Sequence, residues 1–85
     1  MKHATDPTLH SIEHLLSQIR EVESLKEKKL GVFYRKSRAF LHFHEQGDSI
    51  FADVRIAGSE FTRLPCNTDR QQRALVRAII KVTSP

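Results

Sequence analysis

Residues 31–56 alternate between apolar and polar side chains, and this alternation constrains the fold more than any other feature of the sequence. Gly47 and Asp48 separate two runs rich in β-branched and aromatic residues, which is the composition of a hairpin with a two-residue turn. That turn fixes which residues face each other across the hairpin. The predicted pairs are Gln46–Ser49, His44–Phe51, His42–Asp53 and Phe40–Arg55.

The predicted pairing gives the hairpin two different faces, because successive side chains of a strand point to opposite sides. One face is wholly apolar and consists of Ala39, Leu41, Phe43, Ala52, Val54 and Ile56. The other mixes aromatic and ionisable residues, namely Phe40, His42, His44, Phe51, Asp53 and Arg55. A slip of one residue would mix the two sets, so we expect the apolar face to cover the core.

An amphipathic helix is predicted on each side of the hairpin. Apolar residues at steps of three or four predict a first helix over residues 7–24, capped by Asp6 and opened by Pro7. Thr68 and Gln71 have the form of a capping box and predict a second helix that runs to about Val82. Its expected buried face consists of Ala74, Leu75, Ala78, Ile79 and Val82.

Four strands are predicted between the helices, over residues 30–35, 38–45, 49–57 and 60–64. A turn at residues 36–37 would place Tyr34 opposite Ala39 and Phe33 opposite Phe40, whereas the register of the fourth strand stays open. The predicted fold class is α+β: a two-layer α-β-β-β-β-α sandwich with an antiparallel four-stranded meander and both helices on one face. We expect one domain over residues 1–85, with residues 1–5 as a loose tail.

The element order resembles that of frataxin-type sandwiches and of the small bacterial domains of MmcQ/YjbR type. This resemblance implies an architecture and no activity, because frataxins present an acidic first helix to iron, whereas the first helix here carries both signs of charge. The segment GVFYRKSRAFLHFHE, with FADVR after it, is similar to a segment of small bacterial proteins described only as hypothetical. It covers about a third of the chain and implies a bacterial origin.

Composition narrows the functional class. Cys66 is the only cysteine, which excludes an internal disulfide and a zinc site of several cysteines. No apolar run has the length needed to cross a membrane and the first residues lack a signal-peptide core, so we expect a cytoplasmic protein. The chain contains no glycine-rich phosphate loop and no nucleophile motif. We therefore expect a non-enzymatic protein that uses no cofactor.

The mixed face of the sheet is the first candidate site. Phe33, Phe40 and Phe51 are expected to share it with His42, His44, Asp53 and Arg55. An apolar patch of this kind on a small domain is typical of a contact between proteins. The interpretation that we favour is a small interaction domain that forms a homodimer through this aromatic and histidine face.

Two alternatives remain. His42 and His44 project the same way, with Asp53 opposite His42, so the three side chains are candidates for a divalent-metal or small-ligand site. The second alternative is sequence-independent binding of nucleic acid by basic residues of the last helix and of the first hairpin turn. These residues are Arg70, Arg73, Arg77 and Lys81, and Arg35, Lys36 and Arg38.

Overall fold

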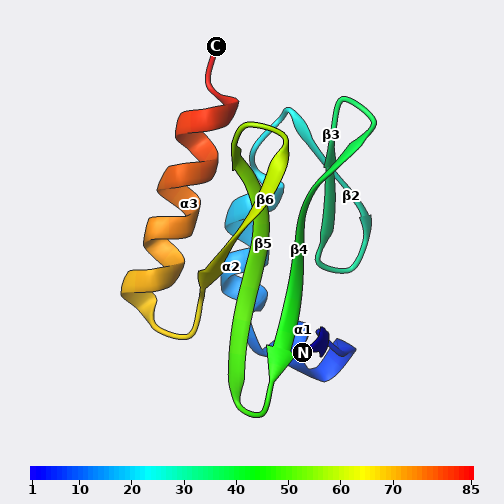
Figure 1. Cartoon of the computed structure of the whole chain (residues 1–85), viewed down its shortest axis with the longest axis vertical. Coiled ribbons are helices and arrows are strands. Elements are labelled where there is room, and N and C mark those ends of the chain that lie inside the picture. The colour runs from blue at the N-terminus through cyan, green and yellow to red at the C-terminus, as the bar shows by residue number, and fades with distance from the viewer.

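Six strands and three helices make up the chain, which a computed structural model describes over residues 1–85 (Figure 1). The strands are β1 (Lys2–His3), β2 (Leu25–Lys29), β3 (Val32–Arg35), β4 (Arg38–Gln46), β5 (Ser49–Ala57) and β6 (Glu60–Pro65). The helices are α1 (Asp6–Ser11), α2 (Glu13–Arg20) and α3 (Asp69–Thr83). All strand pairs are antiparallel, which confirms the predicted α+β class and the antiparallel sheet.

The sheet has the order β2-β3-β4-β5-β6, and β1 is attached to β4. Because β5 occupies one edge of β4, β3 and β1 share the other edge. β3 pairs with the first part of β4, up to Leu41, and β1 pairs with its last part, at His44 and Glu45. In the view of Figure 1, α2 lies behind β4 and β5 while α3 runs beside β6.

The central hairpin has the predicted register. Gln46 pairs with Ser49, His44 with Phe51 and His42 with Asp53, around a two-residue turn at Gly47 and Asp48. The predicted Phe40–Arg55 pair is absent, because the ladder between β4 and β5 ends at Leu41 and Val54.

Four of the six residues on the apolar face of this hairpin are buried, as its alternation predicts, whereas Ala39 and Ile56 are half-buried. Leu41, Phe43, Ala52 and Val54 each expose 3% of their surface or less. They form one hydrophobic cluster with apolar residues of all three helices, namely Leu9, Leu15, Leu16, Ile19, Leu75 and Ile79. Burial of about twelve large apolar side chains is the main stabilising contribution available to a chain of this size.

The N-terminal region differs from the prediction in two respects. Lys2 and His3 form β1 rather than a loose tail. The helix expected over residues 7–24 is divided at Ile12, whose φ of −114° and ψ of 30° interrupt the helical path between α1 and α2. Ile12 is itself buried, and both short helices direct apolar residues into the core on either side of this break. The N-cap is Thr5 and not Asp6, and the hydroxyl of Thr5 donates to Glu45 instead of capping the helix.

β2 was missing from the predicted fold. Its sequence LKEKK carries three lysines and only one apolar residue, so it lacks the apolar alternation by which strands are found. Glu27 takes the inward position that an apolar residue would normally occupy. Its carboxylate accepts hydrogen bonds from the side chain of Arg20 at 2.5 Å and from the backbone N–H of Gly31 at 2.9 Å. A partly exposed ion pair therefore takes the place of apolar contact on this strand.

The pairing of β3 with β4 also differs from the prediction. Tyr34 lies opposite Ala39 as expected, but Phe33 lies opposite Leu41 and not opposite Phe40. The register shifts between these two pairs, so Phe40 has no partner on β3 and marks a β-bulge. Opposite residues share a face, which places Phe33 on the core side with Leu41.

α3 begins as its sequence predicts. Thr68 Oγ1 accepts a hydrogen bond from the N–H of Gln71 at 3.1 Å, and Gln71 Oε1 accepts one from the N–H of Thr68 at 3.2 Å. Leu75 and Ile79 are buried, whereas Ala74, expected on the same face, is exposed. None of the three helices combines the length and the apolar character that crossing a bilayer requires.

We expect Gly31→Ala to lower the free energy of unfolding by roughly 1–2 kcal/mol or more. Gly31 has a φ of +74°, and an added Cβ would lie 2.6 Å from Cδ2 of Leu9. Gly58 is a matched control, because its φ is also +74° and nothing lies within 4 Å of an added Cβ. Urea denaturation should show a larger loss for Gly31→Ala than for Gly58→Ala. Equal losses would contradict the packing of Leu9 against this turn.

Candidate functional site

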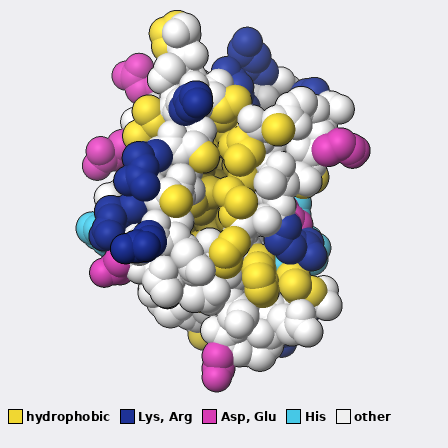
Figure 2. Space-filling view, turned by 60° about the vertical axis from the view of Figure 1, so that its left-hand side comes forward, with side chains coloured by type: hydrophobic (Ala, Val, Ile, Leu, Met, Phe, Trp, Pro, Cys, Tyr) yellow, Lys and Arg dark blue, Asp and Glu magenta, His cyan; other side chains and the backbone are white.

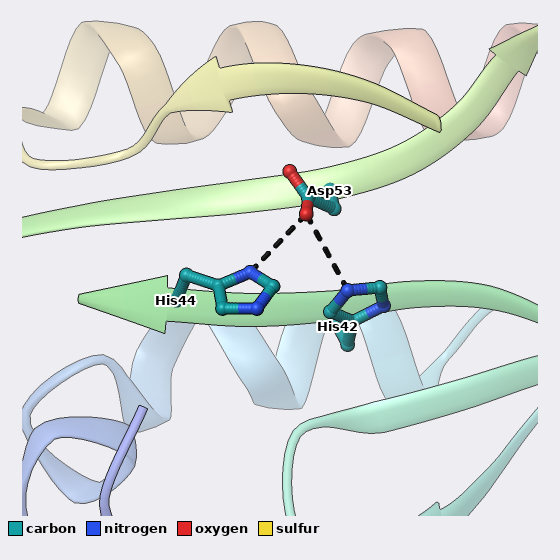
Figure 3. Close-up of side chains that lie close together, drawn as sticks. All are labelled: His42, His44 and Asp53. Carbon is teal, nitrogen blue, oxygen red and sulfur yellow. Dashed lines mark ion pairs between the residues drawn. The ribbon is translucent and has the colours of Figure 1, made fainter. Parts of the chain in front are cut away.

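Three side chains of the second face of the hairpin converge between β4 and β5. Nδ1 of His44 lies 3.1 Å, and Nε2 of His42 lies 3.4 Å, from the same carboxylate oxygen, Oδ2 of Asp53 (Figure 3). One potential metal-ligating atom from each residue lies within 4.8 Å of the other two. Their exposed side-chain fractions are 20% for His42, 13% for His44 and 9% for Asp53. The three side chains therefore lie close together, with Asp53 opposite His42 as predicted, and ligand binding by them stays a prediction.

Arg63 of β6 completes the surroundings of Asp53. Its Nε donates to Oδ1 at 2.7 Å and its Nη2 donates to Oδ2 at 2.7 Å, so the guanidinium grips both carboxylate oxygens. This hydrogen bonding lowers the pKa of Asp53 against the opposing effect of burial, so the carboxylate is ionised at neutral pH. Arg63 is opposite Asp53 because of the β6 register, which the sequence left open.

His3 of β1 is the second residue that sequence reasoning missed. Its ring stacks on the ring of His44 with centroids 4.5 Å apart, and its centroid lies 5.8 Å from that of His42. Pairing of β1 with β4 places His3 directly beside His44. A two-residue strand shows no periodicity, so no signal in the sequence distinguishes His3 from a residue of a tail.

The two histidines of β4 are held in their neutral form. Burial lowers the pKa of both side chains, and this effect exceeds the opposite effect of the Asp53 carboxylate. Nδ1 of His44 is fully buried and lies 3.1 Å from Oδ2 of Asp53.

Two of the three residues of the predicted aromatic patch are buried, and Phe51 lies opposite His44 as predicted. Phe33 and Phe40 expose only 1% and 3% of their surfaces, and Phe51 is half-buried. The exposed aromatic residue of this face is Phe61, which sequence reasoning did not select and which is 37% exposed. Its ring lies 4.8 Å from that of His42 and 4.1 Å from the guanidinium carbon of Arg55. Homodimerisation through this face stays a prediction, with less apolar surface to drive it.

The basic residues expected to contact nucleic acid lie in two separate places. Those of α3, Arg70, Arg73, Arg77 and Lys81, are all exposed. Figure 2 shows basic side chains in a row along one flank of the molecule, with apolar side chains beside them. Arg35, Lys36 and Arg38 surround the turn between β3 and β4. Nucleic-acid binding by either group stays a prediction.

Cys66 lies before α3 but is no nucleophile in this environment. The residue is fully buried, and burial raises the pKa of its thiol to about 12. The side chain is therefore a neutral member of the hydrophobic cluster.

The chain was compared with protein-family models, with curated proteins and with solved structures, and none of the three comparisons gave a match. Function must therefore be inferred from the site itself.

The lowered pKa values of His42 and His44 predict that the protein loses stability in mild acid. The unfolded chain binds protons at the ordinary histidine pKa of 6.5, whereas the folded chain resists protonation until a lower pH. The stability that comes from the two neutral histidines is therefore fully present above the ordinary pKa, and it is lost as the pH falls below that value. Urea denaturation between about pH 7.5 and about pH 5.5 should show this decrease. The double variant His42→Gln/His44→Gln should lose less stability over the same pH range. An equal loss in the variant would show that these two histidines do not cause the pH dependence.

Proposed function

We propose that the chain binds a divalent metal ion of the zinc class through His42, His44 and Asp53. The observation that carries the proposal is the convergence of two imidazole nitrogens and one carboxylate oxygen within 4.8 Å of one another, on side chains that are at most 20% exposed. A cation between these three atoms would be bound by two imidazole nitrogens and one carboxylate oxygen.

The spacing of the three atoms supports the proposal. Ligand atoms bound at about 2.0–2.1 Å in a tetrahedral zinc site lie roughly 3.4 Å from one another. The two nitrogens of His44 and His42 lie 3.1 Å and 3.4 Å from Oδ2 of Asp53. All three atoms lie within 4.8 Å of one another, so the two imidazole rings would have to approach each other to bind the ion.

The surroundings supply the support that metal ligands need. His42 and His44 share a strand and Asp53 lies on its neighbour, so regular backbone pairing holds all three. Arg63 binds the carboxylate through both oxygens and could keep Oδ1 while Oδ2 binds the ion, in the manner of a residue that orients a ligand. The fourth position is left for water or for the exposed ring of His3. We also propose that the helices cover the face of the sheet that carries Leu41 and Phe43. The ion would then reach the histidines from the opposite face.

The ligand types favour some ions over others. Two imidazoles and one carboxylate suit zinc, nickel, cobalt or copper, whereas calcium and magnesium prefer oxygen ligands alone. The neutral state of both histidines favours binding at neutral pH, because a protonated imidazole has no lone pair to offer.

We expect the metal-free protein to take up one equivalent of zinc, measured by calorimetry, and to give a tetrahedral visible spectrum with cobalt. The double variant His42→Gln/His44→Gln should lose this binding, with affinity reduced at least roughly a hundredfold, since two of three ligands are gone. Circular dichroism and a thermal melt would show that the variant still folds.

The matched control is His10→Gln/His14→Gln, which removes two exposed histidines from α1 and α2 instead. This variant should bind zinc as the unmodified protein does. A flat calorimetric titration of the unmodified protein, or equal losses in both double variants, would refute the proposal.

A further inference from the structure

A cavity of about 220 Å³ lies between the β3–β4 turn and the β5–β6 turn, away from the histidine cluster. Four of the residues that line it are basic, namely Arg35, Lys36, Arg38 and Arg55, and none is acidic. The buried ring of Phe40 is part of the same wall. The cavity is thus a small, strongly positive pocket with one apolar surface.

The four cations lack the partners that would normally balance them. The ion pairs of the molecule involve Arg20, Arg63 and the two histidines of β4, so no carboxylate lies within 4.0 Å of the pocket's basic groups. Arg35 and Arg38 lie directly opposite each other across the hairpin. Like charges in directly opposite positions destabilise a sheet, so the pocket concentrates repulsion that an anion would relieve.

The guanidinium groups of Arg35 and Arg55 differ in their hydrogen bonding. Nε of Arg35, a residue that lines the pocket, is buried and has no hydrogen-bond partner. Arg55 is already held in place, since its Nε donates to the carbonyl of Ala39 at 2.6 Å and its Nη1 donates to the carbonyl of Ser59. Its guanidinium also lies over the ring of Phe61.

The turn that brings Arg35 and Arg38 together is itself costly. Lys36 and Ser37 have φ values of 51° and 70°, in the left-handed region that residues with a Cβ seldom adopt. Asparagine and glycine are the usual residues of such a turn. The chain instead keeps a fourth cation, Lys36, at this position.

We propose that this pocket binds a phosphoryl group. One guanidinium, with several N–H donors in a plane, can bind both oxygens of a carboxylate and balance its single charge. A phosphoryl group has more oxygens and up to two negative charges, so it needs several cationic side chains. The three arginines and one lysine around this small cavity supply the donors and the positive charge that a phosphoryl group needs. The phosphoryl group could belong to a small phosphorylated molecule or to the backbone of a nucleic acid, and the chemistry of recognition is the same.

The test titrates metal-free protein with inorganic diphosphate at low ionic strength, followed by calorimetry and by backbone amide shifts. We expect saturable binding with shifts concentrated at residues 35–39, 55 and 58. The variant Arg35→Gln/Arg38→Gln should bind at least roughly tenfold more weakly, since it loses charge-assisted hydrogen bonds. The control Arg73→Gln/Arg77→Gln removes the same charge from exposed positions of α3 and should stay within about twofold of the unmodified protein.

A single-stranded oligonucleotide titrated in parallel distinguishes the two sources of the phosphoryl group. Tighter binding of the oligonucleotide, lost in the pocket variant, would assign the pocket to backbone phosphates. Binding of diphosphate alone would assign it to a small phosphorylated molecule, and both results support the proposal. Equal weakening in the two double variants, or shifts that spread along α3, would overturn it, and the amide shifts of the unmodified protein decide the matter even if a variant fails to fold.

Discussion

The pairing of β4 with β5 is the constraint on which the rest of the structure depends. A two-residue turn at Gly47 and Asp48 sets the register, and the register decides which side chains reach the core. Leu41, Phe43 and Val54 are buried because of it, and His42, His44 and Asp53 meet on the opposite side for the same reason. Since one register serves both faces, the candidate site cannot move without exposing the core.

Electrostatics then divide the second face into two regions. Around Asp53, positive and negative groups balance, since Arg63 grips the carboxylate while burial keeps the two histidines of β4 neutral. Around the β3–β4 turn, four cations have no acidic partner. The ring of Phe61 touches both regions, with His42 on one side and Arg55 on the other. The first region suits a cation and the second an anion.

The sequence predicted those parts of the molecule in which local pattern and tertiary structure agree. The central hairpin, the capping box of α3 and the proximity of His42, His44 and Asp53 follow from alternation and turn chemistry. It did not predict features that depend on distant contacts. β1 exists through its pairing with β4, β2 pairs with β3 and carries the Arg20–Glu27 ion pair, and a bulge at Phe40 turns Phe33 into the core. His3 and Arg63 reach the site through such contacts, so neither could be selected from the sequence.

The central claim is the register of the hairpin, and cross-strand nuclear Overhauser effects test it most directly. The structure requires close backbone contacts between Phe43 and Ala52 and between Leu41 and Val54. Observation of both would establish that His42 and His44 share a face with Asp53. Contacts displaced by one residue, such as Phe43 with Asp53, would separate the histidines from the carboxylate and contradict both the core and the site.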